Sequence, residues 1–89
     1  MRINDAFKNK TLVITGGTGS FGSTVLKHFL QSDLSEIRII SRDEKKQDMM
    51  RHILQARFPE QAGKVQFHVG DVRNIDSVRE VMYGANYVF

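Results

Sequence analysis

The sequence predicts an α/β protein whose parallel sheet is covered by helices on both faces. Short apolar segments alternate along the chain with longer segments whose apolar residues recur at helical spacing, and a glycine-rich turn joins the first strand to the first helix. The resulting order, βαβαβαβ, indicates parallel strands joined by right-handed crossovers. We expect a three-layer α/β/α arrangement with the spatial strand order 3-2-1-4.

The individual elements follow from apolar periodicity and from residues that begin or end helices. The expected strands cover residues 11–15, 36–41, 65–69 and 86–89, and the expected helices cover about 20–31, 43–58 and 74–83. Pro59 ends the second helix, Asn74 is the expected N-cap of the third, and Gly84 fits its end. The apolar side chains expected to face the core are Phe21, Val25, Leu26, Phe29, Leu30, Met50, Ile53, Leu54, Phe58, Val65, Phe67, Val69, Ile75, Val78 and Met82.

Composition limits the class of protein. With 89 residues, of which 40% are hydrophobic and 26% charged, the chain is the size of one small soluble domain. The lack of cysteine excludes disulfides and zinc-thiolate sites and fits a cytoplasmic location. No apolar run approaches the ~18 residues that span a membrane. The net charge is +3, but basic residues are interleaved with acidic ones, so we expect no nucleic-acid partner. The three histidines lack metal-ligand spacing, so we expect no metal site.

The glycine-rich turn carries the first functional signal. It reads Thr15-Gly16-Gly17-Thr18-Gly19-Ser20-Phe21-Gly22 and satisfies both the G-x-G-x-x-G and the G-x-x-G-x-x-G spacing. A chain that leaves a strand, turns sharply and begins a helix presents backbone N–H groups and the helix dipole to an anion. Glycine is needed where a Cβ would collide. Between a strand and a helix, this pattern predicts the pyrophosphate site of a Rossmann-type dinucleotide-binding domain.

Residues of the turn have separate expected roles. Thr18 and Ser20 either donate hydroxyl hydrogens to the phosphates or cap the helix, and the side chain of Phe21 is expected in the core. The expected cofactor-binding residues of the turn are Gly16, Thr18, Gly19, Ser20, Phe21 and Gly22.

The end of the second strand is where the adenosine ribose of such a cofactor would lie. Arg42 stands there, about 20 residues beyond Gly22, at the usual offset of the residue that recognises the ribose. A basic side chain pairs with a 2′-phosphate, so Arg42, followed by Lys45 and Lys46 on the first turn of the next helix, favours NADP over NAD. Asp43 is near enough to bind the ribose hydroxyls, or else it is the N-cap of the second helix with the basic residues as a solvated face.

The loop after the third strand supplies a third candidate. Its sequence is Gly70-Asp71-Val72-Arg73, at the carboxyl edge of the sheet where ligands of open α/β sheets bind. The Asp71 carboxylate would accept from the adenine amino group while the Val72 backbone contacts the ring. The alternative is a loop aspartate that caps the following turn. The residues alone favour neither.

Together these three segments resemble the extended short-chain dehydrogenases. Within that superfamily the chain is similar, over nearly its whole length, to nucleotide-sugar dehydratases of bacterial polysaccharide biosynthesis, of the UDP-N-acetylglucosamine 4,6-dehydratase and 5-epimerase type. The resemblance implies that Ser41 and Arg42 with a neighbouring lysine hold the 2′-phosphate of NADP and that Asp71 and Val72 hold adenine. It also implies oxidation of a UDP-sugar at C4, elimination of water across C5 and C6, and return of the hydride to C6.

No catalytic residue is expected in these 89 residues. A Tyr-x-x-x-Lys pattern is absent, since the fourth residue after Tyr83 is Tyr87, and the resemblance implies that the catalytic and sugar-binding residues lie beyond the fourth strand. We therefore expect residues 1–89 to be the amino-terminal part of a single NAD(P)-binding domain, without the substrate domain and inactive alone. The complete enzyme is expected to be a homo-oligomer. The alternative is a non-catalytic NADP-binding sensor or regulatory module of the same fold.

Overall fold

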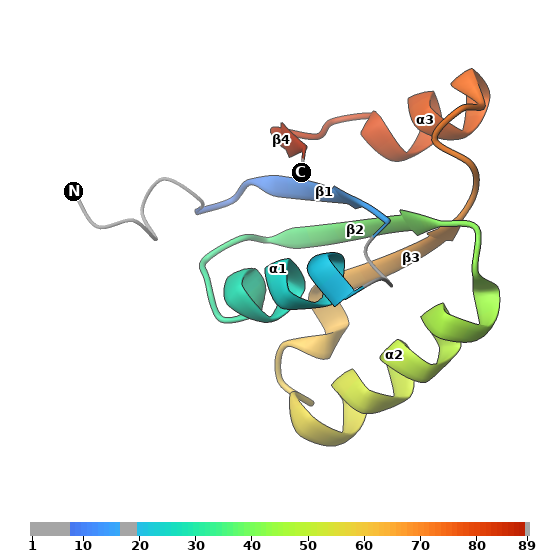
Figure 1. The fold of residues 1–89 in the computed structure, drawn as a ribbon. Coiled ribbons are helices and arrows are strands. Elements are labelled where there is room, and N and C mark those ends of the chain that lie inside the picture. Colours follow the sequence, from blue (N-terminus) through green and yellow to red (C-terminus); the bar gives the residue numbers. More distant parts are fainter. Residues whose placement is uncertain (1–7, 17–19, 89) are drawn as a thin grey trace.

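The computed structural model describes residues 8–16 and 20–88, with residues 20–23 described by their backbone alone. Its elements are β1 (Thr11–Thr15), α1 (Ser20–Leu30), β2 (Glu36–Ser41), α2 (Glu44–Arg57), the short 3-10 turn η2 (Ala62–Lys64), β3 (Val65–Val69), α3 (Ile75–Met82) and β4 (Tyr87–Val88). The strands form one sheet in the order β3-β2-β1-β4, and every pairing is parallel (Figure 1). The predicted strand order and α/β class are therefore confirmed. Among the described residues, no helix is long and apolar enough to cross a bilayer.

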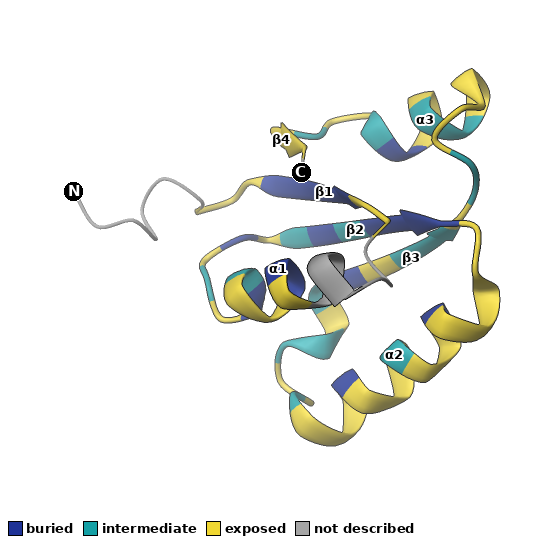
Figure 2. Ribbon diagram, in the orientation of Figure 1, coloured by how far each residue is buried: buried dark blue, intermediate teal, exposed yellow. Residues whose placement is uncertain are grey.

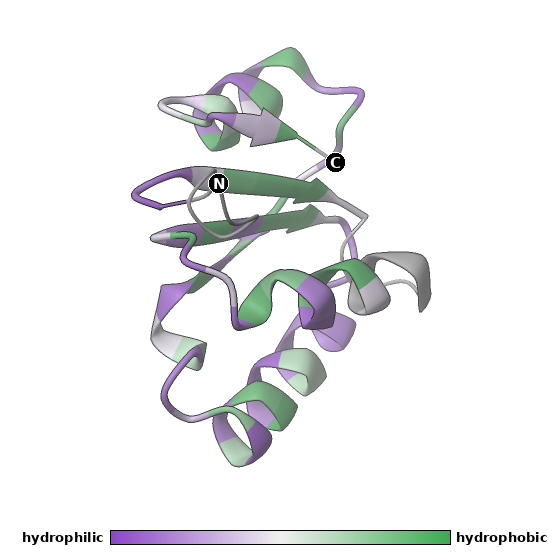
Figure 3. Ribbon diagram, turned by 90° about the vertical axis from the view of Figure 1, so that its left-hand side faces the viewer, coloured by the Kyte–Doolittle hydropathy of each residue, from purple (hydrophilic) through white to green (hydrophobic). Residues whose placement is uncertain are grey.

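The larger part of the core lies between the sheet and helices α1 and α2. Alternate residues of a strand face opposite sides, and Ile14, Ile37 and Ile39 point to this side with at most 1% of their surface exposed. Leu26 and Leu30 of α1 pack against them. The apolar strands run between the helical layers in Figure 3, and buried residues concentrate on the central strands in Figure 2. The expected inward faces of the first two strands are confirmed, and so are the expected inward residues Val25, Leu26, Phe29 and Leu30 of α1. The side chain of Phe21, also expected in the core, lies outside the described part of the chain.

The opposite face of the sheet carries a smaller cluster under α3. Val13 and Ile40 pack there against Val81, which is 1% exposed. The prediction that Ile75 faces inward is wrong, because that side chain is 66% exposed. The carboxyl half of α3 supplies the packing residues, Val81 and Met82, so the buried stripe of this helix is shifted toward its end.

Two further expected core residues are exposed. Ile53 of α2 is 45% exposed and Val69 of β3 is 59% exposed. In α2 the buried residues are Gln47 and Leu54, which define a narrow stripe, and Ile53 lies beside it. Val69 ends the edge strand of the sheet, where a neighbouring strand is present on one side alone.

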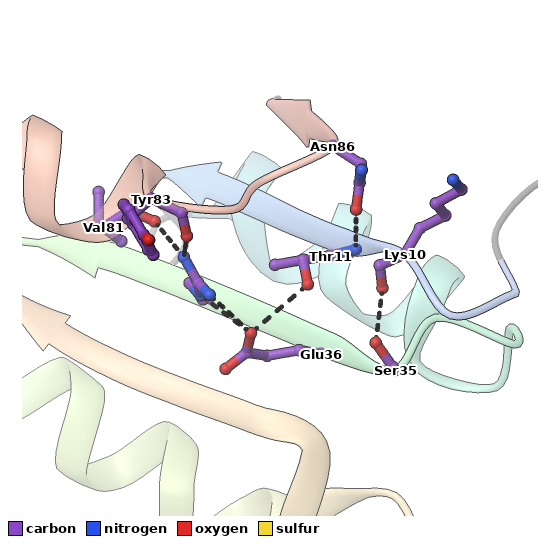
Figure 4. Close-up of polar contacts among 8 residues, drawn as sticks. Lys10, Thr11, Ser35, Glu36, Val81, Tyr83 and Asn86 are labelled. Carbon is purple, nitrogen blue, oxygen red and sulfur yellow. Dashed lines mark hydrogen bonds and ion pairs between the residues drawn. The ribbon is translucent and has the colours of Figure 1, made fainter.

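Polar contacts join α3 and the segment before β4 to the sheet. The apolar pattern of the sequence does not predict them. The backbone N–H of Thr11 donates to Asn86 Oδ1 at 2.9 Å, and the Asn86 N–H donates back to the Thr11 carbonyl oxygen at 3.0 Å. Arg38 of β2 donates through Nη1 to the carbonyl oxygens of Val81 and Tyr83 at the end of α3. The two Arg38 bonds satisfy carbonyl oxygens at the end of α3 that have no partner within the helix. Figure 4 draws them together with the bond from the Thr11 N–H to Asn86 Oδ1.

Candidate functional site

The carboxyl ends of β1, β2 and β3 meet at one edge of the sheet (Figure 1). Two backbone hydrogen bonds join the loops that leave this edge. The Gly16 N–H donates to the Ile40 carbonyl oxygen and the Gly70 N–H donates to the Ser41 carbonyl oxygen, both at 2.9 Å. Around them is an open hollow of about 390 Å³, lined by Gly16, Ile40, Ser41, Arg42, Gly70, Asp71, Val72 and Arg73. The structure thus brings together residues from all three predicted segments.

The glycine turn is described at its two ends. Gly16 has φ +65°, in the left-handed region that favours glycine. Gly17, Thr18 and Gly19 lie outside the described residues. The α1 helix begins at Ser20, so Ser20, Phe21 and Gly22 form its first turn, where backbone N–H groups have no partner within the helix. A strand, a glycine with positive φ and a helix amino terminus therefore follow in the order that the motif requires.

A second, more open hollow of about 690 Å³ lies beside the end of β2. It is lined by Gly16, Ser41, Arg42, Asp43, Glu44, Lys45 and Lys46. The side chains of Arg42 and Lys46 are 68% and 62% exposed, so both cations are accessible to a ligand. Ser41 is 8% exposed and lines both hollows. This corner holds the predicted 2′-phosphate residues together.

Asp43 is the N-cap of α2. Its backbone is extended (φ −96°, ψ 93°), and its Oδ1 accepts from the Lys46 backbone N–H at 3.0 Å. The helix-capping alternative is therefore confirmed for this residue, while contact with a ribose hydroxyl stays a prediction. Lys46 Nζ lies 4.0 Å from Asp43 Oδ2, a long and exposed ion pair that contributes little to stability.

Asp71 is engaged by two arginines. Its Oδ1 accepts from the Arg73 backbone N–H at 2.9 Å, so it also caps the turn that follows. The Arg73 guanidinium contacts both carboxylate oxygens at 2.9 to 3.2 Å, and Arg42 Nη1 lies 3.7 Å from Oδ2. The side-chain and backbone hydrogen bonds from Arg73, reinforced by the charges of Arg73 and Arg42, lower the pKa of Asp71 to about 2. The carboxylate is ionised near neutral pH and acts as a hydrogen-bond acceptor.

Sequence reasoning missed Gln47, which lines neither hollow but contacts Ser41 of the site from α2. It is 2% exposed, and its amide nitrogen donates to oxygens of Ser41 and His68. A glutamine in a helix is ordinarily an exposed residue. The single signal in the sequence is its place on the buried stripe of α2, in register with Met50 and Leu54.

The described residues contain no group of three or more His, Cys, Asp and Glu placed to hold a metal ion. The two hollows present instead backbone N–H groups, a serine hydroxyl, basic side chains and the carboxyl groups of Asp43, Glu44 and Asp71. These are the groups that bind phosphates and a polar heteroaromatic ring.

Curated relatives of the chain are named UDP-glucose 4-epimerase. The proteins of Rickettsia rickettsii (strain Sheila Smith) and Rickettsia felis are 55% and 54% identical to it over 87 residues. The match covers 93% of this chain and 24% of each relative, so the chain spans about a quarter of their length.

Solved structures of similar fold include Pen from Bacillus thuringiensis, with TM-score 0.77 and 36% identity over 93% of this chain and 24% of that one. The C-domain of a bacterial malonyl-CoA reductase, solved with NADP, has TM-score 0.70 over 98% of this chain and 15% of its own, but its 20% identity shows likeness of fold alone. The family described as polysaccharide biosynthesis protein matches residues 12–89, and the chain belongs to this family.

Proposed function

We propose that the chain is the cofactor-binding part of a UDP-sugar enzyme of polysaccharide biosynthesis and that it binds NADP in preference to NAD. The observation that carries the proposal is the convergence of three loops, after β1, β2 and β3, around adjoining hollows at one edge of the sheet. Ligands of open parallel sheets bind at this edge. The UDP-sugar relatives and the family of the chain support the substrate class.

The residues present fit a dinucleotide. Gly16 and the amino terminus of α1 would hold the pyrophosphate, where backbone N–H groups and the helix dipole favour an anion. Ser41, Arg42 and Lys46 line one hollow and would hold the 2′-phosphate. The ionised carboxylate of Asp71 is an acceptor for the adenine amino group. In this proposal Arg42 and Lys46 make the protein bind NADP more tightly than NAD, because the 2′-hydroxyl of NAD carries no charge with which they could pair.

For the reaction, we propose a UDP-N-acetylglucosamine 4,6-dehydratase that inverts C5, or a related epimerase. When bound, the nicotinamide supplies a hydride acceptor and donor. Oxidation at C4 is the first step of both reactions. Return of the hydride to the opposite face of C4 inverts that carbon, whereas loss of water across C5 and C6, followed by return of the hydride to C6 and of a proton to C5, gives a 4-keto-6-deoxy sugar. The relatives named UDP-glucose 4-epimerase support the epimerase alternative.

Two measurements on the protein expressed from its complete gene test the proposal. Fluorescence titration should give a lower Kd for NADPH than for NADH, and equal or tighter binding of NADH would overturn the NADP assignment. NMR of reactions with UDP-N-acetylglucosamine and with UDP-glucose, run in deuterated water, separates a 4-keto-6-deoxy product from a C4 epimer. Cofactor binding without turnover of either sugar would favour the sensor alternative. Homo-oligomerisation stays a prediction that light scattering can check.

A further inference from the structure

Arg73 is an exposed residue whose side chain pairs with the carboxylate of the candidate site. Its side chain is 74% exposed, and its guanidinium contacts both oxygens of Asp71, with Nη2 at 2.9 Å from Oδ2. Such a two-pronged contact fixes the relative position of the two groups. An ion pair this exposed contributes little to the stability of a fold. The main effect of Arg73 therefore falls on the charge that the site presents to a ligand.

Arg42 lies where the two hollows of the site adjoin. It lines both of them, whereas Asp71 and Arg73 line the first hollow. Its Nη1 is 3.7 Å from Asp71 Oδ2, which is beyond hydrogen-bonding distance. The guanidinium of Arg42 can thus either approach Asp71 in the first hollow or turn to an anion in the second.

The charge of the second hollow depends on Arg42. The other charged side chains in its described lining are two carboxylates and two lysines, which balance one another, namely Asp43, Glu44, Lys45 and Lys46. Arg42 therefore supplies the excess positive charge that a 2′-phosphate, with about two negative charges near neutral pH, would meet there. A carboxylate beside Arg42 without a partner of its own would cancel this excess.

Arg73 prevents this cancellation, because it balances the charge of Asp71 within the first hollow. The pKa of Asp71, lowered to about 2 mainly by the side-chain and backbone hydrogen bonds from Arg73, reflects how closely the two groups are paired. We propose that Arg73 is a positioning residue for cofactor specificity, which neutralises Asp71 and so leaves the Arg42 guanidinium to pair with the 2′-phosphate of NADP. The inference rests on the proposed dinucleotide site.

The backbone holds Asp71 in place without the Arg73 side chain. Asp71 Oδ1 accepts from the Arg73 backbone N–H at 2.9 Å, and the Asp71 carbonyl oxygen accepts from the Asn74 N–H at 2.9 Å. Neither bond involves the guanidinium. Arg73→Ala therefore leaves a carboxylate beside Arg42 and removes the charge that balances it.

The test compares NADPH with NADH by fluorescence titration of the protein expressed from its complete gene. In Arg73→Ala the carboxylate attracts Arg42 and repels the 2′-phosphate, so we expect the Kd for NADPH to rise about fivefold to tenfold. The Kd for NADH should change less than about twofold, since its ribose carries no charge at this place. Arg73→Lys keeps the charge without the planar fork and should keep the ratio of the two Kd values within about threefold of the wild-type ratio.

Two further variants separate this role from others. In an Asp71→Asn background, adding Arg73→Ala should leave the ratio of the two Kd values unchanged, because no carboxylate is left to balance. Arg79→Ala removes one positive charge from an exposed position of α3. It should also leave the ratio unchanged, which excludes an effect of net charge.

Phosphorus NMR of bound NADPH gives a readout that a merely structural role would not change. A carboxylate without a balancing charge raises the pKa of a nearby phosphate. The 2′-phosphate signal should therefore titrate at a higher pH in Arg73→Ala than in the wild-type protein. In Arg79→Ala it should titrate as in the wild-type protein.

The outcomes separate this inference from the proposed function. If the wild-type protein binds neither cofactor, or binds NADH more tightly, the proposed NADP site is wrong and the role of Arg73 falls with it. If the wild-type protein prefers NADPH but Arg73→Ala changes neither the ratio nor the phosphate titration, the site stands and the role of Arg73 is wrong. Persistence of the Arg73→Ala effect in the Asp71→Asn background, or a ratio for Arg73→Lys equal to that for Arg73→Ala, would likewise overturn it.

Discussion

Arg42 Nη1 lies 3.7 Å from Asp71 Oδ2, so the loop after β2 is joined to the loop after β3 through an ion pair at the mouth of the site. The sequence predicts separate roles for these residues, with Arg42 at the 2′-phosphate and Asp71 at adenine. The Arg42 side chain is 68% exposed, and an exposed ion pair at this distance contributes little to the stability of the fold. Arg42 can therefore turn to a phosphate at small cost, while Asp71 keeps its contacts with Arg73.

Arg42→Ala should weaken NADPH binding selectively. Removing the guanidinium deletes a charge-assisted interaction with the 2′-phosphate, which we expect to raise the Kd for NADPH about tenfold or more and to leave that for NADH nearly unchanged. Fluorescence titration measures both. Arg57→Ala is the matched control, because Arg57 is an exposed arginine at the far end of α2. Equal losses for both cofactors would show that Arg42 does not contact the 2′-phosphate.

The acid titration of Asp71 should depend on Arg73. The pKa of Asp71 lies at about 2, below its ordinary value of 3.8, so its contacts contribute stability that is present above about pH 4 and is lost as the pH falls toward 2. Replacing Arg73 by Ala removes the largest cause of the shift, the side-chain hydrogen bonds, together with the charge of Arg73, but keeps the backbone N–H bond, so the pKa should rise part of the way toward 3.8. Carboxyl ¹³C NMR between pH 3 and 6 would show Asp71 titrating in the variant and staying ionised in the wild-type protein. An unchanged titration would contradict the assigned contacts.

Gly16→Ala should destabilise the protein although the added Cβ meets nothing within 4 Å. The cause is the backbone, since φ is +65° and a left-handed conformation costs a non-glycine residue roughly 1–2 kcal/mol. Gly63 is the matched control, because a Cβ there also meets nothing and its φ lies outside the left-handed region. Urea unfolding should show a loss for Gly16→Ala and a neutral or slightly stabilising effect for Gly63→Ala. If both variants lost similar amounts of unfolding free energy, the effect of Gly16→Ala would not come from its positive φ.

Ile39→Ala should lower the free energy of unfolding by about 2–5 kcal/mol, because it opens a cavity in the fully buried centre of the sheet. Ile53→Ala makes the same chemical change at a side chain that is 45% exposed. Its effect should be smaller by at least about 1 kcal/mol. Denaturant unfolding of both variants measures the difference, and equal losses would contradict the burial that the structure assigns to Ile53.

The helix caps show how far local sequence predicts local structure. Asp43 and Asn74 each accept from backbone N–H groups of the first turn of a helix, as residue type and position indicated for Asn74 and as one of two alternatives for Asp43. A cap is formed within three residues of chain, so the sequence contains all that is needed. Ile53 and Ile75 mark the limit, since helical spacing indicates an apolar stripe but not which part of that stripe touches the sheet.

The sequence by itself determined the parallel α/β architecture, its strand order and the place of the glycine turn, because apolar periodicity and the handedness of crossovers act through contacts that recur along the chain. Tertiary structure alone decided that Arg42 reaches Asp71, that Gln47 binds Ser41 and His68, and that Arg38 holds the end of α3. These contacts join residues of different elements. Their formation depends on side-chain directions at a common edge or face of the sheet, which no periodicity in the sequence encodes.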